Sequence, residues 1–163
     1  MLPNSQHVNT ALFEENGAVE SMNKGTIVID MSTIHPFETD KIRKKLSLMG
    51  ISMIDSPIGR TSVEAIQGKS LLMVGGEDKD IQKATTMLNL IGDTIQNCGG
   101  PGMGSRMKIV NNYMTTVLNV LRAETLTLAR SVGLNQDKCL EVLSGTAAVR
   151  SHLTTTYPAK VLQ

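Results

Sequence analysis

The stretch GPGMGSRMKIVNNYM, residues 100–114, marks the place where the pattern of this sequence changes. Before it, short β-branched apolar runs alternate with amphipathic segments. After it no strand pattern appears, and apolar side chains recur at helical spacing, at Val110, Met114, Val117, Leu121 and Leu128. A helix over 101–132 would be roughly 45 Å long at 1.5 Å per residue. We therefore predict two domains, 1–99 and 100–163, the second of them all-helical.

The first domain is predicted to alternate strands and helices. Strand patterns lie at 25–32, 51–58, 70–76 and 93–99. Helical patterns lie at 5–16, 35–49, 61–68 and 78–92, and a further one follows the long helix at 135–145. Such alternation is typical of an α/β fold with a mostly parallel sheet. The predicted fold class is α/β, with a long helix that opens the second domain.

Composition and charge argue against several function classes. The formal net charge is +1 and aromatic residues make up 2%, which favours neither an electrostatic nor a stacking surface for nucleic acid. No apolar run approaches the roughly 20 residues that span a bilayer. Cys98 and Cys139 lack the spacing of a zinc site or redox motif. We expect a cytoplasmic protein with no metal site that binds neither nucleic acid nor membrane.

The glycine-rich loop at the domain boundary resembles a phosphate-binding loop only superficially. The segment GGPGMGSRMK fits neither G-x-G-x-x-G nor G-x-x-x-x-G-K-[ST]. Pro101 suits the first turn of a helix. We predict a hinge that leads into the start of the long helix.

A polar stripe follows that loop on the long helix. Lys108, Asn111, Asn112 and Thr115 are spaced at i, i+3, i+4 and i+7, so they share one face. Asparagine is a poor helix former, and two together near a helix start need a reason. The stripe is either a solvated face or a set of groups placed for hydrogen bonding.

The segment SPIGRTS is a further candidate site. Arg60, Thr61 and Ser62 follow a strand that ends at Pro57, and ligands of open α/β sheets bind beyond the carboxyl ends of strands. A guanidinium beside two hydroxyls suits a small anion with several oxygens. The alternative is a turn with an exposed arginine and a helix cap.

The segment DMSTIHP offers the same two interpretations. Ser32 and Thr33 lie at the end of a predicted strand, where they could cap the next helix or face a ligand. His35 has no visible partner, and we assign it no role.

Three segments together resemble the β-hydroxyacid dehydrogenase family, the relatives of 3-hydroxyisobutyrate dehydrogenase. They are VIDMSTIHP, DSPIGRTSVEAIQGKSLLMVGG and GGPGMGSRMKIVNNYM, in the family's order. The resemblance implies a partial Rossmann-like sheet, a long helix into an all-helical domain, and NAD as the cofactor. It also implies a homo-oligomer that acts on a small anionic aldehyde or hydroxy acid.

The resemblance also implies roles for individual residues. Lys108 would be the catalytic acid and base at the carbonyl oxygen, and Asn112 would orient that oxygen. Arg60 would bind the anionic group of the substrate. The remaining substrate positions would be Thr61, Ser62, Asn111, Tyr113, Met114 and Thr115, and those lining the dinucleotide would be Leu2, Pro3 and Thr33.

The substrate loop departs from the pattern of most family members. Most of them have Ser-Gly-Gly, which suits a carboxylate, where this chain has Gly59, Arg60 and Thr61. The resemblance implies a member that reduces a sulfonated three-carbon aldehyde with NADH. The alternatives are a member with a carboxylate substrate, of the hydroxyisobutyrate or tartronate semialdehyde type, and a non-catalytic α/β module.

In this family the G-x-G-x-x-G motif that binds the cofactor is expected before the position of Met1. The family's later helices, which include a lysine near the nicotinamide, are expected after Gln163. The sequence therefore predicts an internal fragment of a longer enzyme. We expect the isolated chain to be inactive, to bind NADH weakly or not at all, and to self-associate through the apolar stripe of the long helix.

Overall fold

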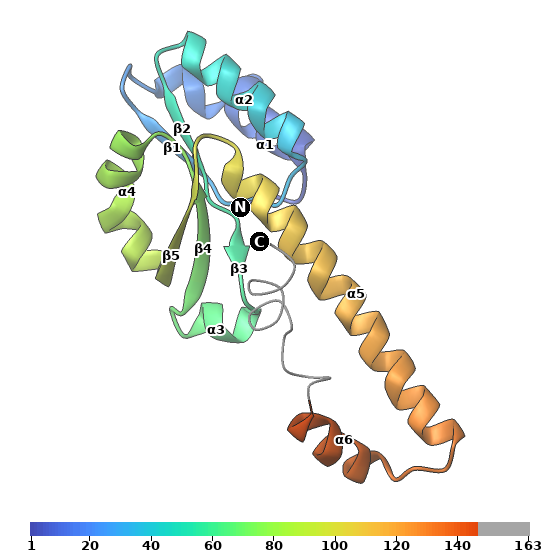
Figure 1. Cartoon of the computed structure of the whole chain (residues 1–163). Coiled ribbons are helices and arrows are strands. Elements are labelled where there is room, and N and C mark those ends of the chain that lie inside the picture. Colours follow the sequence, from blue (N-terminus) through green and yellow to red (C-terminus); the bar gives the residue numbers. More distant parts are fainter. Residues whose placement is uncertain (147–163) are drawn as a thin grey trace, which may run out of the picture. The chain divides into compact units, whose positions relative to one another are not determined.

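The computed structural model describes residues 1–146, and Figure 1 shows the arrangement of their helices and strands. The chain divides into two compact units, Met1–Tyr113 and Met114–Gln163. The strands are β1 (Ile27–Asp30), β2 (Ser52–Asp55), β3 (Ile58–Gly59), β4 (Ser70–Gly75) and β5 (Gly92–Gly99). The helices are α1 (Ser5–Phe13), the short 3₁₀ helix η1 (Ala18–Ser21), α2 (Pro36–Leu48), α3 (Ser62–Ile66), α4 (Asp78–Ile91), α5 (Met103–Ser131) and α6 (Gln136–Gly145).

The α/β fold class is confirmed, and every predicted element is present within a few residues of its expected bounds. The single strand predicted over 51–58 is divided into β2 and β3 on either side of Pro57. A proline has no N–H to give to a ladder, so a strand tends to be interrupted there. The tail after residue 146, for which the sequence shows no periodicity, lies outside the described residues.

The sheet contains parallel pairs, as predicted, but also two antiparallel pairings. Strand β1 pairs parallel with β2, and β4 pairs parallel with β5, whereas β4 runs antiparallel to both β2 and β3. A parallel connection needs a crossover of about a dozen residues or more. Between β3 and β4 lie only residues 60–69, which hold the short α3, so the chain turns back beside β3.

Two hydrophobic clusters hold the sheet unit together. One joins α1 and α2 to one face of the sheet and includes Val8, Leu12, Ile42, Leu46 and Met53. The other joins α4 to the opposite face and includes Ile54, Leu72, Val74, Ile81 and Leu88. Met53 and Ile54 are neighbours in β2 that enter different clusters, because successive side chains of a strand point to opposite faces. Figure 1 shows α1 and α2 on one side of the strands and α4 on the other.

Helix caps explain several polar residues near the strand ends. Asn4 caps α1 by accepting from the backbone N–H of His7. His35 caps α2 by accepting from the N–H of Phe37, with Pro36 as the first helical residue. The cap of α2 is therefore His35, for which we predicted no role, and not Ser32 or Thr33. Within residues 1–146 no helix is both long enough and apolar enough to cross a membrane.

Candidate active site

The carboxyl ends of β1 and β2 form the edge of the sheet at which the candidate site lies. The parallel register pairs Asp30 with Asp55. Asp30 accepts a hydrogen bond from the backbone N–H of Ser32, and the Ser32 hydroxyl accepts one from the N–H of Leu2 at 2.9 Å. This contact brings Leu2, which precedes α1, beside the segment that holds Thr33, so two of the predicted cofactor positions lie at the same edge. Leu2, Pro3 and Thr33 are all exposed there.

Asp55 joins this edge to the start of α5. Its two carboxylate oxygens accept from the backbone N–H of Gly102 at 2.7 Å and of Ser105 at 2.6 Å. A carboxylate here satisfies N–H groups that the helix leaves unpaired and opposes the positive end of the helix dipole. Asp55 is 2% exposed. Burial raises the pKa of Asp55, although the hydrogen bonds from Ser105 and Gly102 oppose that effect.

The glycines of the loop are required for the close approach of α5 to the sheet. A Cβ atom on Gly104 would lie 2.3 Å from the carbonyl oxygen of Met73 and 2.6 Å from that of Asp55. Gly102 has φ +83°, a region that favours glycine. The loop thus has a packing role at the start of the helix, and it does not form a phosphate-binding turn.

Two further contacts fix the first turns of α5 against α2. The hydroxyls of Thr39 and Ser105 are 3.1 Å apart and buried. Arg106 forms an ion pair with Asp40 at 2.6 Å, and this pair holds the pKa of Asp40 below its usual value. The orientation of the following turn of α5 is therefore set by contacts with the sheet unit.

Lys108, the predicted proton donor, lies on that following turn. Its Nζ donates to the carbonyl oxygen of Ile58 at 2.6 Å, across 50 residues of sequence. Ile58 is in β3, directly before the loop that carries Arg60. The side chain is partly buried, and burial lowers the pKa of Lys108. A lysine with a lowered pKa exchanges protons more readily near neutral pH.

The asparagine pair continues the face of α5 that begins at Lys108. The amide of Asn111 donates to the side-chain oxygen of Asn112 at 3.4 Å. Asn112, Tyr113, Met114 and Thr115 are exposed, and Asn111 is partly exposed. Most of the stripe beyond Lys108 is thus accessible to solvent in this structure, and its contact with substrate stays a prediction.

Arg60 is held by residues at the beginning of β4 and β5. Its Nη1 donates to the carbonyl oxygen of Lys69 at 2.5 Å and forms an ion pair with Asp93 at 2.6 Å. Its Nη2 donates to the Thr94 hydroxyl at 2.8 Å. The backbone of Arg60 has φ +67°, which is unusual for a residue other than glycine or asparagine. The predicted anion-binding residue therefore has protein partners that the sequence did not indicate.

Thr61 and Ser62 begin α3. Thr61 is its N-cap in a capping box, since its hydroxyl accepts from the N–H of Val63 and the carboxylate of Glu64 accepts from the N–H of Thr61. The hydroxyl of Thr61 also donates to Glu64. This is the helix-cap interpretation that the sequence left open for Thr61. Both residues are exposed, and a contact with substrate remains a prediction.

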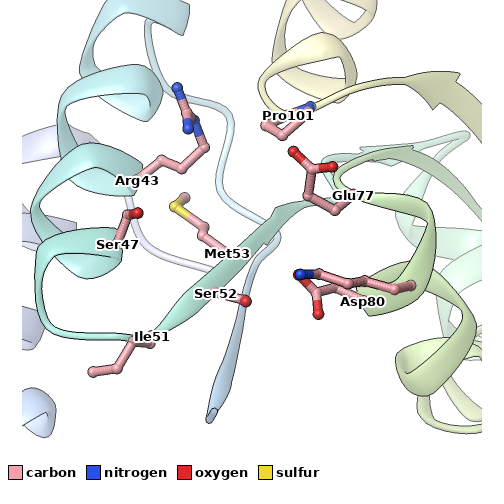
Figure 2. A pocket seen from close by; sticks show the side chains of 9 residues that line it. Arg43, Ser47, Ile51, Ser52, Met53, Glu77, Asp80 and Pro101 are labelled. Carbon is pink, nitrogen blue, oxygen red and sulfur yellow. The ribbon is translucent and has the colours of Figure 1, made fainter. Parts of the chain in front are cut away.

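A pocket of about 230 Å³ lies elsewhere in the sheet unit, between α2 and the first turn of α4. Figure 2 shows its polar lining. It is lined by Arg43, Ser47, Ile51, Ser52, Met53, Glu77, Lys79, Asp80 and Pro101. None of the predicted site residues is among them. In the part of the chain that the structure describes, no group of His, Cys, Asp and Glu side chains could hold a metal ion.

Asp55 and Asp93 are the important residues that sequence reasoning missed. Asp55 had a local signal, because an aspartate that ends a buried strand is well placed to meet a helix N-terminus. Asp93 had no local sequence signal, because it is 33 residues from Arg60 and lies at the beginning of a weakly predicted strand. Only the path of β4 and β5 brings it to the loop.

Comparisons with known proteins identify the family of this chain. Residues 1–100 match the family model described as the NAD-binding domain of 6-phosphogluconate dehydrogenase. Residues 102–163 match the model described as NAD-binding of NADP-dependent 3-hydroxyisobutyrate dehydrogenase. The fold and these matches define an α/β protein of an NAD-binding oxidoreductase family. The chain belongs to the β-hydroxyacid dehydrogenase family, which confirms the resemblance, the enzyme class of that family and the cofactor NAD.

The chain is also similar to individual members of that family. It is 48% identical over 162 residues to the 3-sulfolactaldehyde reductase of Escherichia coli (strain K12). The matched region covers 99% of this chain and 54% of that reductase. It is 32% identical over 143 residues to the NAD-dependent L-serine dehydrogenase of Pseudomonas aeruginosa, and this match covers 88% of this chain and 48% of the dehydrogenase. The chain spans about half the length of these relatives.

Solved structures share the fold. The 3-hydroxyisobutyrate dehydrogenase of Mycobacterium tuberculosis, solved with L-serine, has a TM-score of 0.83 and 25% identity, with 93% of this chain and 53% of that one covered. An imine reductase variant from Myxococcus stipitatus has a TM-score of 0.80 at 17% identity and shows the fold alone. The two family models meet between residues 100 and 102, whereas the compact units divide after Tyr113. The domain boundary near residue 99 stays a prediction.

Proposed function

We propose that this chain carries the substrate loop and the proton donor of a reductase that converts 3-sulfolactaldehyde to 2,3-dihydroxypropane-1-sulfonate with NADH. The contact that carries the proposal is the hydrogen bond from Lys108 Nζ to the carbonyl oxygen of Ile58 at 2.6 Å. It brings the amine of α5 to the loop that holds Arg60. The 48% identity to 3-sulfolactaldehyde reductase supports the sulfonate substrate. The corresponding metabolic setting is sulfoquinovose degradation.

Lys108 acts on the carbonyl oxygen of the substrate in this proposal. In reduction its ammonium donates a proton to that oxygen as the hydride arrives, and in oxidation its neutral amine takes the proton back. Burial lowers the pKa of Lys108, which makes the neutral form easier to reach. Asn112 lies one helical turn further on and orients the same oxygen. The hydrogen bond to Ile58 keeps the amine at the loop until a substrate oxygen replaces that partner.

The sheet edge fits a dinucleotide. Leu2, Pro3 and Thr33 present exposed apolar and hydroxyl surface at the carboxyl end of parallel strands, where nucleotides bind in α/β sheets. These three residues would line NAD, which supplies or accepts the hydride when it is bound.

We further propose a homo-oligomer in the cytoplasm. Both described cysteines, Cys98 and Cys139, are free thiols, which suits a reducing compartment. The apolar residues Val110, Met114, Val117, Leu121 and Leu128 of α5 are all exposed, and a large exposed apolar surface commonly marks an interface.

The substrate can be tested in a chimeric reductase. In it, this chain replaces the segment of the Escherichia coli 3-sulfolactaldehyde reductase to which it aligns. We expect the chimeric reductase to favour 3-sulfolactaldehyde over tartronate semialdehyde and methylmalonate semialdehyde in kcat/KM, as the parent enzyme should. A chimeric reductase that binds NADH but favours a carboxylate aldehyde would support the alternative substrate class. One that binds NADH and reduces none of them would favour the non-catalytic module.

Replacement of Arg60 by lysine tests the anion site. We expect KM for 3-sulfolactaldehyde to rise more than tenfold in the chimeric reductase, because a single ammonium cannot replace the planar fork of donors at an anion. The measurement is steady-state kinetics on the sulfonate and on glyceraldehyde, a neutral aldehyde of similar size. An equal loss on both aldehydes would show that Arg60 holds the loop and does not bind the substrate.

A further inference from the structure

Arg60 is bound at one end of its guanidinium and unbound along one side. Nη1 donates to Lys69 and Asp93, and Nη2 donates to Thr94. The guanidinium has five N–H groups in a rigid fork. The Nε–H and one N–H of Nη2 form one edge of the fork. Within residues 1–146 Nε makes no hydrogen bond, and Nη2 makes one, to Thr94. That edge is the arrangement that binds two oxygens of an anion at once.

The backbone at Arg60 also needs these contacts. With φ at +67°, the residue is in the left-handed region, where a side chain is unfavourable and glycine is preferred. Such strain persists where surrounding contacts hold it, and it is found most often at functional sites. The three donors of Arg60 supply those contacts, and all of their partners lie at the beginning of β4 and β5.

Asp93 is itself held in place for this contact. Its Oδ1 accepts from the Thr94 hydroxyl at 2.7 Å and from Arg60 at 2.6 Å. The Thr94 hydroxyl, and after it the Arg60 guanidinium, hold the pKa of Asp93 below its usual value. The carboxylate is therefore ionised at neutral pH. The side chains of Arg60 and Asp93 are 32% and 44% exposed, so a small solute can reach the pair.

We propose that Asp93 and Thr94 are positioning residues for substrate specificity. They accept hydrogen bonds from Nη1 and Nη2 of Arg60 and so stabilise its strained backbone. The Nε and Nη2 edge of the guanidinium is then oriented toward the sulfonate. The inference rests on the proposed function of Arg60 and extends it to two residues on a different strand. Asp93 acts through Arg60 and makes no contact with the reacting atoms.

The first test uses kinetics in the chimeric reductase with Asp93→Asn and Thr94→Val. For each variant we expect KM for 3-sulfolactaldehyde to rise about two- to fivefold, the size of a partly exposed charged contact. We expect kcat, and kcat/KM for glyceraldehyde, to stay nearly unchanged. The matched control is Asp78→Asn, an exposed aspartate of the same unit, which should change neither value. In an Arg60→Gly background, Asp93→Asn should have no further effect on KM.

The outcomes separate the two proposals. A parent chimeric reductase without preference for the sulfonate contradicts the proposed function. A sulfonate-selective one whose KM is insensitive to Asp93, or whose response persists without Arg60, overturns the positioning role alone.

A second test is independent of activity and uses urea unfolding of the 163-residue chain. Arg60→Gly should lower the unfolding midpoint when Asp93 is present, because the contacts are lost. In an Asp93→Asn background the same change should lower the midpoint less, because the ion pair is already lost there and only the bonds to Lys69 and Thr94 remain to be removed. An equal drop in both backgrounds would overturn the proposal.

Discussion

Replacement of Lys108 by alanine in the chimeric reductase is expected to lower kcat by about 10²–10⁴-fold, the usual contribution of a general acid. NADH affinity should be nearly unchanged, because the side chain acts on the carbonyl oxygen in the transition state and not on the cofactor. Steady-state kinetics and a fluorescence titration with NADH measure the two quantities. Near-normal turnover in the variant would contradict the role given to Lys108.

The pH dependence offers a control for that result. Because burial lowers the pKa of Lys108, its titration should appear at a lower pH than that of an ordinary lysine. In the oxidation of the alcohol the neutral amine is required, so kcat/KM should rise as the pH passes this pKa. In the reduction the ammonium is required, so kcat/KM should fall over the same interval. If Lys108 is the titrating group, Lys108→Ala should show neither the rise of kcat/KM in oxidation nor its fall in reduction.

Replacement of Gly104 by alanine is expected to destabilise the sheet unit by about 1–3 kcal/mol, the range of a methyl group forced into a packed interior. The added Cβ would lie 2.3 Å from the carbonyl oxygen of Met73 and 2.6 Å from that of Asp55, and neither backbone atom can move freely. To relieve this clash, α5 would have to move away from Asp55, which would weaken the hydrogen bonds that Asp55 accepts from Gly102 and Ser105. Urea unfolding of the 163-residue chain, followed by circular dichroism, measures the effect.

Gly100→Ala is the matched control in the same loop. No heavy atom lies within 4 Å of a Cβ built at Gly100, so that change should leave the unfolding midpoint nearly unchanged. If the two variants were equally stable, the close approach at Gly104 would not be what fixes α5 to the sheet.

The elements and the candidate chemistry follow from short-range pattern. The β-branched runs, the helical spacing of apolar residues and the glycine stops predicted every α-helix and all the strands except the break at Pro57, because each depends on residues a few positions apart. The short η1 was not predicted. The polar stripe that begins at Lys108 was also predicted from the spacing of residues a few positions apart on one helix. The resemblance to the β-hydroxyacid dehydrogenases also depends on contiguous motifs, and the family matches confirm it.

The connection between β3 and β4 shows where local pattern was insufficient. Its strands were predicted, but their direction was not, because direction depends on whether the linking segment can cross the sheet. Residues 60–69 are too few for a parallel crossover, so β4 runs antiparallel to β3. That reversal brings the beginning of β4 and β5 beside the Arg60 loop.

Local pattern in the sequence was therefore enough to predict most of the elements, the family and the residues that can carry the chemistry. The partners of these residues depend on the tertiary fold: Asp55 contacts Gly102 and Ser105, Lys108 contacts Ile58, and Arg60 contacts Asp93. These pairs are separated by 33 to 50 residues. Periodicity, capping and turn signals act over a few residues, whereas contacts at this range depend on strand order, strand direction and the packing of α5 against the sheet.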